Sequence, residues 1–178
     1  MKTIAVYGSS IIQPHEQNYK DAYKVGQALA KAGFAVVSGG YGGIMEAASH
    51  GAAEAGGHVI GVTSGAVEAH RGKGTKGNQW VKEEIHYETM RERMMHLVNE
   101  PDGYVIMSGG LGTLNELAAA WEFIRIGELP RRPIICYGDY WNELLDALRR
   151  MPYMKPSAWE ILQYANTAQE IIDILHKD

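Results

Sequence analysis

Short runs of β-branched and apolar residues alternate with longer helical patterns along the whole chain. Strands separated by helices in this way are typical of a parallel sheet that is covered by helices on both faces. The pattern therefore predicts a doubly wound, Rossmann-like α/β fold. Its strands are expected at residues 3–7, 35–38, 58–63, 104–107, 133–137 and 161–164, and its helices at residues 16–32, 44–55, 87–98, 113–126, 141–150 and 167–176.

The length and composition fit one globular domain. A chain of 178 residues can bury a sizeable core and no break in composition divides it, so residues 1–178 are expected to form a single domain. The net charge of -4 offers no basic field for a nucleic acid polymer. Neither a run of about 18 apolar residues nor a signal pattern points to a membrane partner or to export. Because Cys136 is the only cysteine, we expect a reducing, cytoplasmic location.

One local sequence occurs twice. Residues 38–46 and 108–116 agree in a serine, three glycines and a final glutamate, and each segment follows an apolar strand and opens a helix. Glycine at such a junction lets a ligand approach the backbone, and the free amides of the helix attract an anion. The repeat predicts a phosphate or carboxylate ligand. The alternative is that these glycines only make tight strand-to-helix turns.

Neither loop matches a standard nucleotide fingerprint. Met45 and Asn115 stand where a dinucleotide motif has its third glycine, and Gly72-Lys73 is not followed by Ser or Thr, so NAD and ATP are disfavoured. In a sheet of the common order 3-2-1-4-5-6, the turn after the first strand and both loops border one crevice. The candidate phosphate-binding residues are Gly8, Ser9, Ser10, Gly40, Tyr41, Gly42, Gly43, Gly109, Gly110, Leu111, Gly112 and Thr113.

Two charged residues are candidates for chemistry. Glu116 lies near the start of the helix after the second loop, and Arg93 lies in the segment Met90-Arg91-Glu92-Arg93. Each has a plain structural alternative, because Thr113 to Glu116 also reads as a capping box and Arg93 could be a solvated helix charge. The histidines show no metal-ligand spacing, so no metal is expected. Residues 64–80 lack periodicity and are interpreted as either a lid or a surface loop.

These motifs together resemble the Lonely Guy family of cytokinin riboside 5′-monophosphate phosphoribohydrolases, whose relatives often carry the name lysine decarboxylase. The resemblance implies that Arg93 and Glu116 are catalytic, that Met90 joins the substrate-binding residues and that residues 109–113 bind phosphate. Three positions depart from the family pattern. Ser108 replaces a proline, Met94 the lysine after the arginine, and Asn115 the first of two glutamates.

The implied reaction is hydrolysis of the N-glycosidic bond of a purine-type nucleoside 5′-monophosphate, whether cytokinin-like or AMP-like, with no cofactor. A decarboxylase would need pyridoxal phosphate and a Schiff-base lysine, and no lysine stands in a context that indicates this role. The alternative is a non-catalytic binder or carrier of a phosphorylated cofactor, as in the molybdenum cofactor carrier proteins of the same superfamily. A carrier uses the same glycine loops but does not need Arg93 and Glu116 together.

The predicted helix at residues 87–98 carries Met90, Met94 and Met95, which add apolar surface. Together with the family resemblance, this surface predicts a homodimer, whereas the alternative is a methionine stripe that packs only on its own sheet. Analytical ultracentrifugation at micromolar concentration should give the mass of two chains. A monomeric mass would contradict the dimer.

Overall fold

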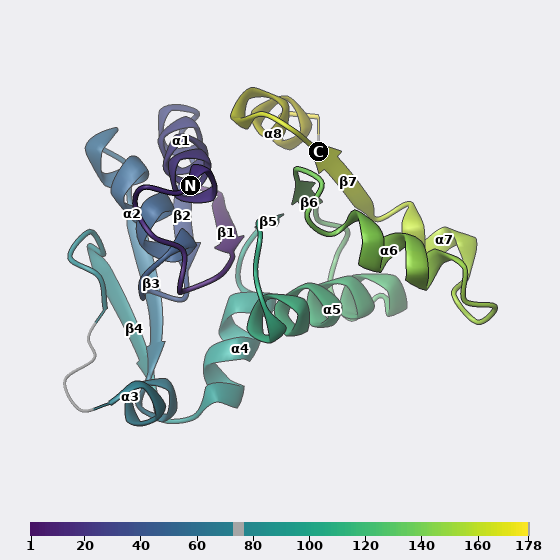
Figure 1. Ribbon diagram of the computed structural model, residues 1–178, viewed down its shortest axis with the longest axis horizontal. Coiled ribbons are helices and arrows are strands. Elements are labelled where there is room, and N and C mark those ends of the chain that lie inside the picture. Colours follow the sequence, from purple (N-terminus) through teal and green to yellow (C-terminus); the bar gives the residue numbers. More distant parts are fainter. Residues whose placement is uncertain (73–76, 178) are drawn as a thin grey trace.

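The computed structural model describes residues 1–72 and 77–177. Within them, parallel strands form a seven-stranded sheet in the order β4-β3-β2-β1-β5-β6-β7 (Figure 1). The strands are β1 Thr3–Tyr7, β2 Ala35–Ser38, β3 Val59–Ser64, β4 Glu83–Tyr87, β5 Gly103–Ile106, β6 Ile134–Tyr137 and β7 Leu162–Ala165. The helices are α1 Gln17–Lys31, α2 Ile44–Glu54, α3 Gly65–Arg71, α4 Met90–Asn99, α5 Leu111–Ile126, α6 Asn142–Arg149, α7 Pro156–Trp159 and α8 Ala168–Leu175.

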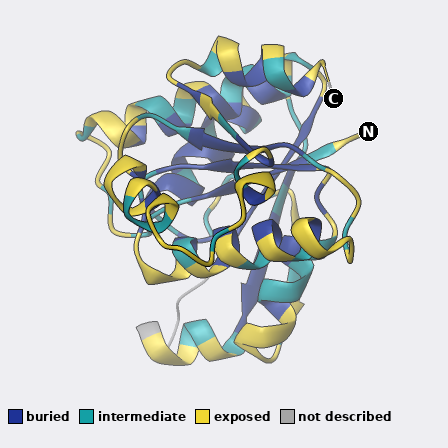
Figure 2. Ribbon diagram, turned by 90° about the vertical axis from the view of Figure 1, so that its right-hand side faces the viewer, coloured by how far each residue is buried: buried dark blue, intermediate teal, exposed yellow. Residues whose placement is uncertain are grey.

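The central strand β1 supplies both layers of the core. Ile4 and Val6 pack in the layer that contains α1, α2 and α8, whereas Ala5 and Tyr7 pack in the layer that contains α4, α5, α6 and α7. This division follows from the two-residue period of a strand, which points successive side chains to opposite faces. Figure 2 shows the buried residues in the strands and on the inner sides of the helices. The doubly wound α/β prediction is therefore confirmed.

Two glycines let α1 and α2 pack backbone to backbone. A Cβ atom at Gly26 would overlap the carbonyl of Ala48, and one at Gly51 would overlap the carbonyl of Tyr23. Close contact of this kind holds the start of α2, and the glycine loop that precedes it, in a fixed place beside β1.

The predicted strand order is confirmed, with one strand more than the sequence indicated. The prediction missed β4, which pairs with β3 at the edge of the sheet. Its sequence, Glu-Glu-Ile-His-Tyr, carries charges that an edge strand tolerates but that hide the apolar pattern. The helix predicted at residues 87–98 was consequently placed too early, because Tyr87 ends β4 and Thr89 caps α4.

The segment at residues 64–80 also differs from the prediction. It contains the short helix α3, whose N-cap is the Ser64 hydroxyl that accepts a hydrogen bond from the Val67 amide. Residues 73–76 of the predicted lid or surface loop lie outside the described residues. None of the helices in the described part of the chain has the length and apolar character that a membrane span requires.

Candidate functional site

Three loops meet at the carboxyl ends of β1, β2 and β5, as the predicted strand order requires. The backbone of Ser9 joins them, because its N–H donates to the carbonyl of Ser108 at 2.9 Å and its carbonyl accepts from the N–H of Ile44 at 2.9 Å. The loop after β1 is thus hydrogen-bonded to both glycine-rich loops. It holds them on either side of one crevice.

A cleft of about 360 Å³ opens between these loops. Most of the predicted binding residues line it together with both charged candidates, whereas Gly40, Gly42, Gly43 and Gly109 do not. Three apolar residues that the sequence analysis did not single out complete the wall: Ile11, Met45 and Val67. The predicted residues on the lining are Gly8, Ser9, Ser10, Tyr41, Met90, Arg93, Gly110, Leu111, Gly112, Thr113 and Glu116.

The second glycine loop presents the N-terminus of α5 to the cleft. The helix begins at Leu111, and its first internal hydrogen bond runs from the Leu114 amide to the Gly110 carbonyl at 3.0 Å. The amides of Leu111, Gly112 and Thr113 precede that bond and therefore have no acceptor within the helix. Apart from its chain neighbours and its own helix backbone, a Cβ atom at Gly110 or Gly112 would meet no protein atom within 4 Å, so a ligand can reach the backbone there. The arrangement suits an anion.

The first glycine loop has the same local sequence but different surroundings. Gly43, with φ of 67°, packs against the backbone of Ser9 and Ser10, and Gly40, with φ of 75°, faces β3. The first amide of α2 is already bonded to Ser9. This loop therefore packs against its neighbours, and it contributes Tyr41 and Met45 to the cleft lining.

Arg93 is buried and held by backbone carbonyls. Its side chain is 5% exposed, its Nε donates to the Val62 carbonyl at 2.7 Å, and its Nη2 donates to the Gly39 carbonyl at 3.1 Å. The guanidinium also lies 5.6 Å from the centre of the Tyr41 ring. Both carbonyls fix the planar fork in one orientation. Arg93 is thus no solvated helix charge.

Gly39 was missed by the sequence analysis. A Cβ atom at this position would overlap Nη2 of Arg93, so only glycine lets the guanidinium reach the backbone. The signal was present in the sequence, because Gly39 matches Gly109 in the repeated segment. The reason for the glycine became visible only when Arg93 was placed beside it.

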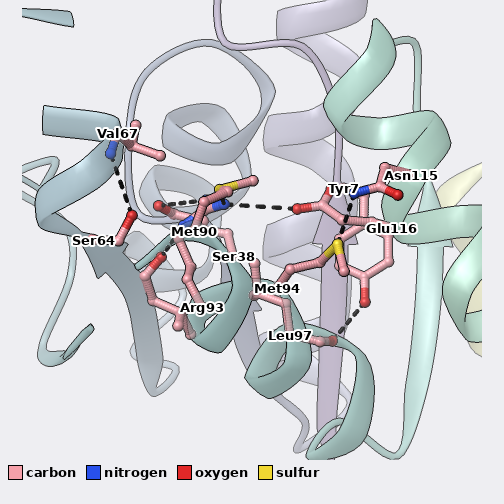
Figure 3. A network of polar contacts seen from close by, with 12 residues as sticks. Tyr7, Ser38, Ser64, Val67, Met90, Arg93, Met94, Leu97, Asn115 and Glu116 are labelled. Carbon is pink, nitrogen blue, oxygen red and sulfur yellow. Dashed lines mark hydrogen bonds and ion pairs between the residues drawn. The ribbon is translucent and has the colours of Figure 1, made fainter. Parts of the chain in front are cut away.

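Figure 3 shows Glu116 facing Arg93. Its Oε1 lies 3.9 Å from Nη1 of the arginine. The alternative reading as a capping box is wrong, because α5 begins at Leu111 with Gly110 as its N-cap and has no side-chain cap. Thr113 lies inside the first turn instead. Burial raises the pKa of Glu116 from 4.5 to about 7, although the charge of Arg93 acts to lower it. A carboxyl group with this pKa can exist in both protonation states near neutral pH.

Two of the three departures from the family pattern touch each other. The side-chain amide of Asn115 donates to Sδ of Met94 at 2.7 Å, which links α5 to α4 (Figure 3). Neither residue lines the cleft. The two exchanges therefore alter a contact between helices beside the site.

Among the described residues, one group of potential metal ligands brings its ligand atoms within 4.8 Å of one another, namely Glu68, Glu84 and His86. It lies outside the cleft lining. The Thr63 hydroxyl donates to Glu84 at 2.7 Å and lies 3.0 Å from Nδ1 of His86, so protein contacts already engage these groups.

Known proteins resemble this chain in sequence over almost its whole length. The family model described as possible lysine decarboxylase matches residues 45–175. A probable cytokinin riboside 5′-monophosphate phosphoribohydrolase of Oryza sativa subsp. japonica is 29% identical and aligns with 99% of this chain and 83% of its own length. A cytokinin riboside 5′-monophosphate phosphoribohydrolase of Mycobacterium tuberculosis is 28% identical, with 96% and 91% covered.

Solved structures share the fold. The molybdenum cofactor binding protein of the phototrophic bacterium Rippkaea orientalis superposes with a TM-score of 0.76 over 99% of this chain and 96% of its own. At 24% sequence identity this likeness concerns the fold alone.

The raised pKa of Glu116 predicts how stability depends on pH. Because folding raises the pKa from 4.5 to about 7, the stability that this carboxyl contributes is fully present below pH 4.5 and is lost as the pH rises through 7. The loss should amount to about 3 kcal/mol. Glu116→Gln removes this pH-dependent loss, because glutamine does not ionise. As the pH rises from 4.5 through 7, the variant should therefore become more stable relative to the wild type in urea unfolding.

The control is Glu122→Gln, on the same helix but exposed and hydrogen-bonded to Arg125. The Arg125 hydrogen bond lowers the pKa of Glu122, so this variant should show no such gain. A difference between Glu116→Gln and the wild type that does not change with pH would contradict the assigned pKa.

Proposed function

Since the chain belongs to the Lonely Guy family, whose family model is described as possible lysine decarboxylase, we propose that it hydrolyses the N-glycosidic bond of a purine-type nucleoside 5′-monophosphate. The products are the free base and ribose 5-phosphate. The observation that carries the proposal is the buried pair of Arg93 and Glu116 in the same cleft as the free amides at the start of α5.

The cleft offers a separate environment to each part of such a substrate. The phosphate binds the amides at the start of α5, where Gly110 and Gly112 leave the backbone open. The ribose lies next to Glu116. The base extends along the wall that Met45, Val67 and Met90 form, because an aromatic ring packs favourably against apolar and thioether side chains.

Departure of the base leaves positive charge at the ribose carbon C1′. The bond from C1′ to the base nitrogen breaks, a water oxygen bonds to C1′, and the base leaves with a proton in place of the sugar. The carboxylate of Glu116 stabilises the cationic centre or accepts the proton of the attacking water. Arg93 keeps Glu116 oriented and favours its ionised form.

The same cleft supports hydrolysis better than decarboxylation of an amino acid. Pyridoxal phosphate chemistry requires a lysine for the Schiff base, and the described residues that line the cleft include no lysine. The remaining alternative is a non-catalytic binder or carrier of a phosphorylated nucleotide-type cofactor. It would use the anion site alone, so turnover distinguishes the two functions.

Glu116→Gln tests the catalytic proposal. Incubation with AMP and isopentenyladenosine monophosphate, followed by an assay of the released base, should show a loss of roughly 100-fold or more in turnover, because the neutral amide lacks the required charge. Affinity for the monophosphate should change little. The wild-type rate should rise with pH through about 7 as Glu116 ionises.

Turnover of the glutamine variant at the wild-type rate would overturn the assignment of Glu116. Tight binding of monophosphates by the wild type without release of any base would instead favour the carrier.

Gly112→Ala tests the phosphate site. The added Cβ meets no protein atom within 4 Å beyond its neighbours and its own helix backbone, and alanine is a better helix former than glycine by about 1 kcal/mol. The variant should therefore be at least as stable as the wild type. The methyl group nevertheless occupies the approach to the amides, so the Kd for AMP measured by calorimetry should rise about 10-fold or more. Asn115→Ala, on the same helix outside the cleft, is the control and should keep wild-type affinity.

A further inference from the structure

Asn78 lies behind the first glycine loop, in the segment that leads to β4. Its backbone N–H donates to the Gly40 carbonyl at 2.7 Å, and its side-chain amide donates to the carbonyls of Gly40 at 3.2 Å and Tyr41 at 3.0 Å. Its side-chain oxygen accepts from the Trp80 amide at 3.1 Å. The half-buried side chain thus ties a segment at the edge of the sheet to the loop after β2.

The two carbonyls that Asn78 binds lie next to the group that holds Arg93. The Gly39 carbonyl accepts from Nη2 of Arg93, and Gly40 turns the chain with φ of 75° so that its own carbonyl faces Asn78. Without the side-chain amide of Asn78, the Tyr41 carbonyl loses this hydrogen bond, and the Gly40 carbonyl keeps the bond from the Asn78 backbone N–H. A glycine backbone relaxes easily when such bonds are lost.

The side chain of Tyr41 connects the first glycine loop to Arg93 and to Ser64. The ring lies under the guanidinium of Arg93, and its hydroxyl accepts from the Ser64 amide at 2.9 Å. Ser64 is the N-cap of α3, the helix that brings Val67 to the cleft wall. A shift of the loop at Gly40 and Tyr41 therefore moves the support of Arg93 and of this wall together.

We propose that Asn78 is a positioning residue for the reaction: by binding the carbonyls of Gly40 and Tyr41, it holds the first glycine loop in the conformation that orients Arg93 toward Glu116. This role rests on the proposed function, because it concerns the efficiency of that reaction. Asn78 does not line the cleft in which the substrate is proposed to bind.

Two variants separate the bonds of Asn78. Asn78→Ala removes all side-chain bonds, whereas Asn78→Asp keeps the size and the acceptor for the Trp80 amide but replaces the donor with an oxygen that repels both carbonyls. The matched control is Lys82→Ala. Lys82 lies in the same segment and also donates from its side chain to a backbone carbonyl, that of Gly57 at 2.8 Å, away from the cleft.

The first readout does not depend on catalysis. The Nε–H of Arg93, bonded to Val62 and buried, should give a slowly exchanging NMR signal that is assigned by its loss in Arg93→Lys. Both Asn78 variants should exchange this proton about 10-fold faster or more, and Lys82→Ala should exchange it at the wild-type rate. Unchanged exchange in both Asn78 variants would overturn the proposal.

The second readout is the pH profile of base release from AMP. Both Asn78 variants should lower kcat roughly 10- to 100-fold with little change in KM, since the phosphate is held by α5 on the other side of the cleft. The ascending limb of the kcat profile should also move to higher pH, because a displaced Arg93 no longer lowers the pKa of Glu116. A wild-type pH profile, or an aspartate variant as active as the wild type, would contradict the role of the amide.

The two readouts distinguish a failure of the proposed function from a failure of the role proposed for Asn78. If the wild-type protein releases no base, the proposed function fails, and the exchange of the Arg93 proton still decides whether Asn78 positions the guanidinium. Melting temperatures of all variants check that each compared protein is folded.

Discussion

The site depends on one pair of backbone hydrogen bonds. Ser9 donates to Ser108 and accepts from Ile44, and these bonds join the loops that follow the three central strands. Because β1 pairs in parallel with β2 on one side and β5 on the other, the three loops emerge at the same edge of the sheet. The cleft, the open N-terminus of α5 and the charged pair all take their positions from this arrangement.

The burial of the charged pair lowers the stability of the folded protein at neutral and higher pH. Burial of Glu116 in a site with one cationic neighbour raises its pKa, so the folded protein must accommodate an ionised carboxylate that water would solvate better. Arg93 compensates for only part of this cost, since its fork is also bonded to the carbonyls of Gly39 and Val62. Such a combination of burial and fixed geometry is characteristic of functional sites, where a matched pKa matters more than local stability.

The two copies of the glycine-rich segment show how the same local sequence serves two purposes. In the second copy, Gly110 and Gly112 face open space and leave the amides of α5 accessible. In the first, Gly39 makes room for Arg93 and Gly43 makes room for the backbone of Ser9 and Ser10. One copy thus leaves a helix end open and the other supports the arginine. The contact between Met94 and Asn115 likewise turns two separate departures from the family pattern into one altered helix contact.

The sequence by itself determined the α/β class and the two glycine-rich junctions, because these depend on periodicity and glycine placement within single elements. The expected gathering of the loops also needed the common strand order of such sheets, which the structure has. Only the tertiary structure decided the edge strand β4, whose charges hide its pattern, and the start of α5 at Leu111, which excludes the capping box. Only the tertiary structure also showed the contacts of Gly39 with Arg93 and of Asn78 with Gly40. These residues are 54 and 38 positions apart in the sequence, respectively. Contacts between residues so far apart leave no periodic pattern in a sequence. They can be identified only in the folded structure, where the sheet brings the elements together.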